Sequence, residues 1–270
     1  MYGPTEMTTH NQQATPRSKT SSSLLSDLPV SQRRGLRRNA LFITTTLGII
    51  AALSLASKAH AAGGSYVVDD GAVNDPGQCN SDVWYTSNRH DRSTNSTVLD
   101  TACTFQGLPG FQWGLTAQRD RSEGDTLNLL SPQLKAQLLA NKDLGIEMAF
   151  TTTGHFALDR GHAFDGADFT IPFTYQPFEA LRINVDAGWT HAYNDGDQQH
   201  AWTWGTGFEY TVVDSLTLIA ERYGQQGGDQ SWQAGPRLHL GPNVDIDLVL
   251  GRNLTGDRDQ WLTTGATLRF

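Results

Sequence analysis

The last ten residues of the chain alternate between apolar and polar side chains and end on an aromatic residue. Counting back from the C-terminus in steps of two gives Phe270, Leu268, Ala266, Thr264 and Leu262. The opposite parity holds Arg269, Thr267, Gly265, Thr263 and, out of pattern, Trp261. Because successive side chains of a β-strand point to opposite faces, this spacing predicts an amphipathic strand. Such a strand requires a sheet that has one apolar face and one polar face.

The same unit, about ten alternating residues followed by a turn or a polar loop, repeats from Gly110 onward. Nine such stretches precede the last one: 111–118, 130–138, 144–151, 169–175, 181–190, 202–210, 216–221, 232–240 and 244–251. With the final strand and two strands around the cysteines, the count is about twelve, and an even number suits a closed bacterial barrel. Closure also removes the unpaired edges of a long meander. Pro132, Pro172 and Pro236 fall inside expected strands, where local bulges are expected.

The connections alternate between short turns and longer charged loops, as they do at the two ends of a membrane barrel. Aromatic residues gather at strand ends and predict two girdles, formed by Trp189, Trp202, Trp232 and Trp261 at one end and by Tyr175 and Tyr210 at the other. Eight glycines fall on the polar face, where small residues make room for long polar side chains. We therefore predict an all-β, closed antiparallel up-and-down transmembrane β-barrel of about 12 strands over residues 78–270. A soluble β-sandwich or a lipocalin-like barrel is the alternative.

The N-terminal part has the features of an export signal. A cluster of four arginines between residues 33 and 38 precedes an apolar stretch over residues 40–55, and Ala59-His60-Ala61 gives a small-x-small cleavage site. We expect residues 1–61 to be a leader with a signal peptide, and residues 62–77 to be a periplasmic segment. A membrane anchor is the alternative. The leader holds seven of the 20 basic and two of the 28 acidic residues, so the remainder has a net charge of −13, which argues against a nucleic-acid partner.

The two cysteines predict one disulfide, because an exported protein meets an oxidising compartment. Cys79 and Cys103 lie symmetrically about Asp91, inside a polar stretch that has the character of a hairpin tip. Residues placed symmetrically about a tip face each other across the ladder. We therefore expect a cross-strand bridge at the foot of the first hairpin, with two free buried thiols as the alternative.

Two resemblances add to these patterns. A terminal strand that ends on Phe270 resembles the last strand of bacterial outer-membrane barrels, in which the final aromatic residue belongs to the signal read by the assembly machinery. The segments Tyr66-Val67-Val68-Asp69-Asp70 and Pro76-Gly77-Gln78-Cys79, with later short motifs, look like a family of uncharacterised proteobacterial outer-membrane barrel proteins. The resemblance implies an outer-membrane location, and lipid, lipopolysaccharide and the barrel-assembly machinery as partners. It carries over no substrate and no catalytic residue.

The predicted lumen face carries ten titratable residues of both signs: Lys135, Glu147, Arg182, Asp186, Glu209, Glu221, Arg237, His239, Asp245 and Asp247. Charges inside a barrel must be paired or hydrated. They either line a selective pore or form a salt-bridge network that fills a small barrel, with Tyr66 to Asp75 as a plug. The sequence leaves both interpretations open.

Enzyme chemistry finds little support in the sequence. A twelve-stranded phospholipase barrel needs a His-x-Ser pair, and an omptin-like protease needs Asp-x-His; neither pattern occurs. His155, Asp159, His162 and Asp165 match no tight metal-ligand spacing, so a solvated loop is the simpler interpretation. We therefore predict a non-enzymatic protein without a cofactor. The favoured function is a small porin-like barrel that passes or binds small solutes, and the alternative is a closed barrel whose charged loops contact other surface molecules.

Overall fold

The computed structural model describes residues 64–89, 94–122, 124–160, 163–194, 197–256 and 258–270. The predicted leader, its cleavage site at Ala59 and Ala61, and the tip of the first hairpin lie outside these residues. Within the described ranges, no helix has the length and hydrophobicity that a membrane span requires.

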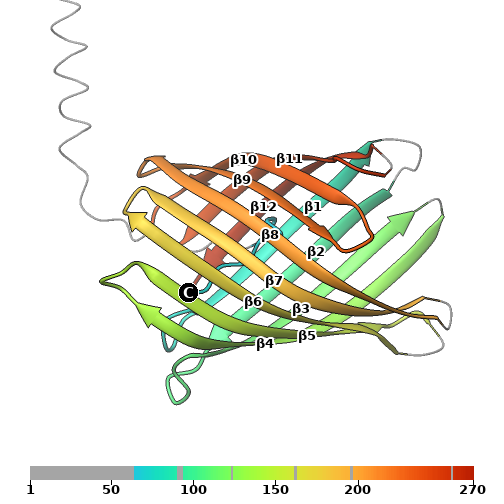
Figure 1. Ribbon diagram of the computed structural model, residues 1–270, viewed down its shortest axis with the longest axis horizontal. Helices are drawn as coiled ribbons and strands as arrows, with labels where there is room; N and C mark the ends of the chain where they lie inside the picture. The colour runs from blue at the N-terminus through green and yellow to red at the C-terminus, as the bar shows by residue number, and fades with distance from the viewer. Residues whose placement is uncertain (1–63, 90–93, 123, 161–162, 195–196, 257) are drawn as a thin grey trace, which may run out of the picture. The chain divides into compact units, whose positions relative to one another are not determined.

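The chain forms a closed barrel of antiparallel strands (Figure 1). The strands are β1 (Cys79–Arg89), β2 (Thr94–Thr104), β3 (Phe111–Ser122), β4 (Asp125–Asn141), β5 (Ile146–Ala157), β6 (Phe164–Phe178), β7 (Leu181–Asn194), β8 (Asp197–Val213), β9 (Leu216–Gln225), β10 (Gln230–His239), β11 (Val244–Asn253) and β12 (Gln260–Arg269). Each strand pairs with its neighbours in sequence, and β1 pairs with β12 to close the barrel. The predicted closed, twelve-stranded antiparallel barrel is confirmed.

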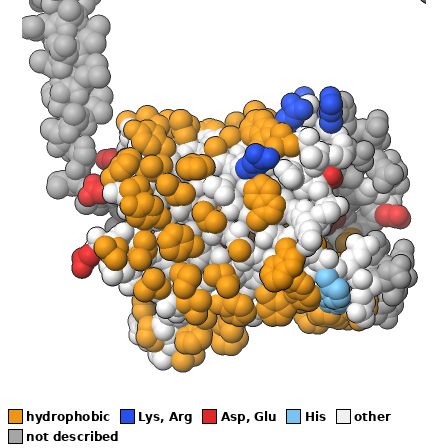
Figure 2. All heavy atoms as spheres, in the orientation of Figure 1, with side chains coloured by type: hydrophobic (Ala, Val, Ile, Leu, Met, Phe, Trp, Pro, Cys, Tyr) orange, Lys and Arg blue, Asp and Glu red, His pale blue; other side chains and the backbone are white. Residues whose placement is uncertain are grey.

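The two faces of the barrel are inverted relative to a soluble protein. Large apolar side chains such as Leu115, Phe208 and Leu248 are about half exposed, whereas charged side chains such as Arg237 and Asp245 are only 1% exposed. Hydrophobic side chains cover most of the outer face visible in Figure 2, and charged side chains lie toward its ends. An apolar outer band around a polar interior is the arrangement that a hydrocarbon solvent selects.

The three strand prolines do not produce the bulges that the sequence predicted. Pro132, Pro172 and Pro236 each pair in register with one neighbouring strand, opposite Leu115, Asp186 and Leu218 respectively. On its other side, each proline leaves a short gap in the ladder and the register continues unchanged across it. Because proline has no backbone N–H, each of these strands loses backbone pairing at the proline, but only with one of its two neighbouring strands. The register shifts of this barrel lie elsewhere, for example between Thr211 and Val213.

The predicted girdle of aromatic residues is correct in part. Trp202 and Trp232 are exposed on the outer face, as are Tyr175 and Tyr210 at the opposite end. Trp261 differs, because its indole nitrogen donates to the side-chain oxygen of Gln233 on the inner face, at 3.2 Å. The alternation of the last strand already placed Trp261 on the polar parity, so the strand period was the better guide.

The two ends of the barrel domain meet at the end with the short turns. Cys79 pairs with Cys103 and forms a disulfide with it, which confirms the predicted cross-strand bridge. Cys79 and Phe270 also exchange two backbone hydrogen bonds, of 2.8 and 2.9 Å. The C-terminal aromatic residue is thereby held in the ladder, while its side chain stays 63% exposed.

Residues 65–75, here called the plug, run through the interior of the barrel rather than along its outside. Val68 is 1% exposed and packs against Gly205 and Gly207, where a Cβ atom added to Gly205 would lie 2.8 Å from Val68 Cγ2. Tyr66 forms an apolar cluster with Ile219 and Val249 of the inner face. Some lumen glycines therefore make room for backbone that enters the barrel, and not only for long side chains of the wall.

Candidate functional site

The plug makes no strand ladder, so its backbone amides need acceptors from the wall. Glu221 of β9 accepts the amides of Val67 and Val68 at 3.0 and 3.2 Å. Asp186 of β7 accepts the amide of Asp69 at 2.7 Å, and the Thr174 hydroxyl of β6 accepts the amide of Gly71 at 2.9 Å. Further along, the side chain of Gln112 accepts the amide of Asn74 at 2.8 Å. Lumen acids thus act as hydrogen-bond acceptors for an irregular segment.

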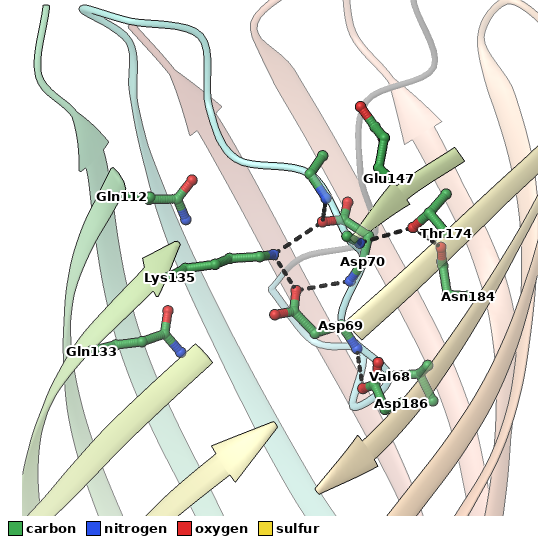
Figure 3. Close-up of polar contacts among 12 residues, drawn as sticks. Val68, Asp69, Asp70, Gln112, Gln133, Lys135, Glu147, Thr174, Asn184 and Asp186 are labelled. Atoms are coloured by element: carbon green, nitrogen blue, oxygen red, sulfur yellow. Dashed lines mark hydrogen bonds and ion pairs between the residues drawn. The ribbon is translucent and has the colours of Figure 1, made fainter. Parts of the chain in front are cut away.

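The acidic side chains of the plug meet the basic side chains of the wall. Figure 3 shows Lys135 reaching from β4 across the lumen to Asp69 and Asp70. The Lys135 Nζ atom lies 2.9 Å from Asp69 Oδ1 and 3.1 Å from Asp70 Oδ1. The guanidinium of Arg182 lies 3.4 Å from the other oxygen of Asp70 and 3.7 Å from Glu147. Charge complementarity therefore holds the plug against two parts of the wall, β4 and β7, which are three strands apart.

The start of the plug is held by apolar contact and by two polar groups. The Tyr66 hydroxyl donates to the carbonyl oxygen of Gly235 at 3.2 Å, and the guanidinium of Arg237 lies 5.2 Å from the centre of its ring. Burial raises the pKa of the Tyr66 phenol above its usual range, so this group stays neutral and remains a donor. The Ser65 hydroxyl donates to Asp247 at 3.3 Å.

A second network joins strands β10, β11 and β12 at the short-turn end. Arg237 forms a two-pronged ion pair with Asp247, with nitrogen–oxygen distances of 2.8 and 2.9 Å. His239 contacts Asp245 at 2.7 Å, and Arg269 forms an ion pair with the same carboxylate. These charges satisfy one another within the wall.

The ten candidate lumen residues differ in which groups they contact. Some contact the plug directly, namely Lys135, Arg182, Asp186 and Glu221. Four others pair within the wall, Arg237 with Asp247 and His239 with Asp245. Arg237 and Asp247 also contact Tyr66 and Ser65 of the plug. Of the remaining two, Glu147 contacts Arg182, and Glu209 accepts from Asn184 at 2.6 Å.

The ten lumen residues predicted from the sequence did not include the uncharged residues that hydrogen-bond to the plug or to its acidic partners. They also did not include every acidic residue that faces the lumen. Thr174 also donates to Asn184 at 2.7 Å, and Gln233 contacts Glu221 at 2.8 Å. Asp100 accepts from the Thr116 hydroxyl on the inner face. Strand parity places these side chains on the polar face, so parity was the available signal, but their role depends on the plug.

The described residues that were considered as metal ligands contact other side chains or backbone groups instead. His155 contacts Ser131 at 2.9 Å and Asp168 at 2.8 Å, Asp159 accepts the amide of Asn128 at 2.8 Å, and Asp165 pairs with Arg160. His162 lies outside the described residues. Among the residues that the structure does describe, no group of three or more His, Cys, Asp or Glu side chains is placed to hold a metal ion.

Two hollows flank the plug inside the barrel. One, of about 910 Å³, extends from Gln78 and Arg269 at the short-turn end to Asp168. The other, of about 360 Å³, extends to Asp229 at the end with the long loops. Both hollows are lined by Val67, Asp168, Thr170 and Asp186, so the two adjoin beside the plug.

A closed antiparallel barrel with an apolar exterior and a polar, partly hollow interior defines an outer-membrane-type β-barrel protein. The chain belongs to the family described as "Uncharacterised conserved protein UCP029691", whose model matches residues 50–270. No curated protein matches the sequence.

Solved structures of porins and channels share the fold. The NanC porin has 10% sequence identity and a TM-score of 0.55, over 70% of this chain and 98% of the porin. An outer-membrane channel from Pseudomonas putida F1 has 12% identity and a TM-score of 0.57, over 74% of this chain and 98% of the channel. The KdgM porin, in complex with disordered oligogalacturonate, has 10% identity and a TM-score of 0.54, over 70% and 99%. At these identities the similarity establishes the fold alone.

Proposed function

We propose that this protein is a narrow outer-membrane channel for small polar solutes, with the plug restricting its lumen. The observation that carries the proposal is the pair of adjoining hollows, which together follow the inner wall from one end of the barrel to the other. The wall along this route presents hydroxyl, amide and charged groups. A polar path of this kind replaces part of the hydration of a passing solute.

The acidic side chains along the route disfavour polyanions. Nine acidic side chains, among them Asp69, Asp168 and Asp186, line the larger hollow against four basic ones, so its lining has a net negative charge. Oligogalacturonate, which accompanies the KdgM porin, is a polyanion, and like charges in a low-dielectric lumen repel it. Small neutral or cationic solutes suit this lumen better than acidic sugars.

A closed, structural barrel is the second candidate, and the anchoring of the plug favours it. Lys135 and Arg182 hold Asp69 and Asp70, and Glu221 holds the preceding amides. In this alternative the plug fills the barrel permanently, and the charged loops of the opposite end contact lipopolysaccharide.

Single-channel recording of the mature protein in planar bilayers separates the two candidates. We expect steady conductance steps, and smaller steps for Thr170→Trp, because this side chain lines both hollows. Thr126→Trp is the matched control, since Thr126 is exposed in β4 and does not line either hollow. A silent bilayer that contains correctly folded protein would support the closed barrel instead.

The apolar outer band of the barrel supports a location in the outer membrane. We infer that the signal peptide is removed near residue 62, and that Phe270 presents its exposed side chain to the barrel-assembly machinery. The exposure of this side chain and its place at the end of the closing strand support that role. Membrane lipid then covers the apolar outer band.

A further inference from the structure

One carboxylate oxygen of Asp186 accepts no hydrogen bond from the described part of the protein. The residue is only 9% exposed, and its Oδ2 atom accepts the amide of Asp69 at 2.7 Å. Its Oδ1 atom is buried and has no hydrogen-bond partner among the described residues. A buried polar atom without a partner costs free energy, so this oxygen favours a group that enters from the lumen.

A second unsatisfied oxygen lies on the same patch of wall. The Thr151 hydroxyl is buried and likewise lacks a hydrogen-bond partner within the described ranges. Thr151 of β5 pairs directly with Thr170 of β6, and Thr170 pairs with Gly188, two residues along β7 from Asp186. Because residues two apart share a strand face, the three side chains occupy one inner patch.

This patch lies beside the route between the two hollows. Thr170 and Asp186 line both hollows, and Thr151 lines the larger one. Asp168, which also lines both, adds negative charge while its oxygens are held by His155 and Thr190. A solute that moves from one hollow to the other therefore passes beside these oxygen atoms.

We propose that Asp186, with the hydroxyls of Thr151 and Thr170, forms a binding position for a small monovalent cation and makes the channel prefer cations. The inference rests on the proposed channel function. Carboxylate and hydroxyl oxygens are ligands for hard cations. One carboxylate with hydroxyls gives a weak site, and conduction needs binding that is weak enough for the ion to leave.

The test is the reversal potential of the mature protein in a planar bilayer across a KCl gradient. We expect K⁺ to be more permeant than Cl⁻, and the permeability ratio to fall roughly threefold in Asp186→Asn, because one unit charge leaves the route. Asparagine keeps an oxygen that can accept the amide of Asp69. The matched control is Asp214→Asn, which removes one exposed charge in a short turn and should leave the ratio unchanged.

Each outcome decides a different point. If the wild-type channel conducts without cation preference, or if Asp186→Asn matches it, the cation position is refuted while the channel function stands. A silent bilayer of folded protein refutes the channel itself. If Asp186→Asn does not fold, Thr151→Val provides the test, because it removes a hydroxyl oxygen with little change of volume. The ratio should then fall by a smaller factor, and an unchanged ratio would refute the site.

Discussion

Lys135 should be the strongest single attachment of the plug, and Lys135→Met tests this. The side chain is 5% exposed and its ammonium bridges Asp69 and Asp70. Its removal leaves the buried carboxylate of Asp70 with one cationic partner fewer, and takes the ammonium partner from Asp69, whose side chain is 35% exposed. Breaking a buried ion pair from one side costs about 3–5 kcal/mol. Arg182 still contacts Asp70 at 3.4 Å, so we expect the lower end, about 3 kcal/mol.

The assay measures how often the plug leaves its site. A cysteine in place of Val68, which is 1% exposed, reacts with a maleimide only when the plug opens. The native cysteines do not compete, because Cys79 and Cys103 are joined. A loss of about 3 kcal/mol corresponds to roughly a hundredfold faster labelling, since each 1.4 kcal/mol is a factor of ten.

Two further variants isolate the ion pair from general damage. Lys142→Met removes an exposed lysine of a short turn and should leave labelling unchanged. Adding Asp69→Asn to Lys135→Met removes one of the stranded charges, so labelling should slow again, and the two substitutions should not be additive. Equal labelling rates with and without Lys135 would show that this ion pair does not hold the plug.

Three other predictions follow from the fold. Gly205→Ala, made in the protein with its native Val68, should lower the free energy of unfolding in urea, because the new Cβ atom would lie 2.8 Å from Val68 Cγ2, whereas Gly107→Ala, with nothing within 4 Å, should not. Maleimide should find no free thiol at Cys79 or Cys103 in the denatured, unreduced protein, and reduction should lower the free energy of unfolding in urea by about 3 kcal/mol. N-terminal sequencing of the outer-membrane fraction should begin near Ala62, and recovery of the protein in a soluble fraction would contradict export.

The sequence by itself determined the barrel and its closure. Alternation with a period of two is a local property, so each strand could be recognised from about ten residues. The cross-strand bridge was also predictable, because Cys79 and Cys103 lie at equal distances from a polar tip. Parity even placed Trp261 on the inner face, against its assignment to the girdle. These features depend on neighbours along the chain or across a single hairpin.

Only the tertiary structure decided what fills the lumen. The sequence assigned residues 62–77 to a periplasmic segment and left open whether Tyr66 to Asp75 plug the barrel. In the structure, residues 65–75 contact distant strands on the inner face. Asp69 meets Lys135 and Asp186, which are 66 and 117 residues away. Parity shows that two side chains share the interior, but it does not show how far each lies along the barrel axis or what lies between them.

The prolines illustrate the same limit. A proline removes one amide from a strand, and the sequence cannot show which neighbour loses the bond or whether the register shifts. In the barrel, Pro172 keeps its pairing opposite Asp186 on one side and leaves a gap on the other. Each strand pairs with two neighbouring strands at once, and which bonds form on each side is decided only in the closed sheet. For that reason the contacts that hold the plug, the charge pairs of the wall and the unpartnered oxygen of Asp186 could be identified only once the strands were in register.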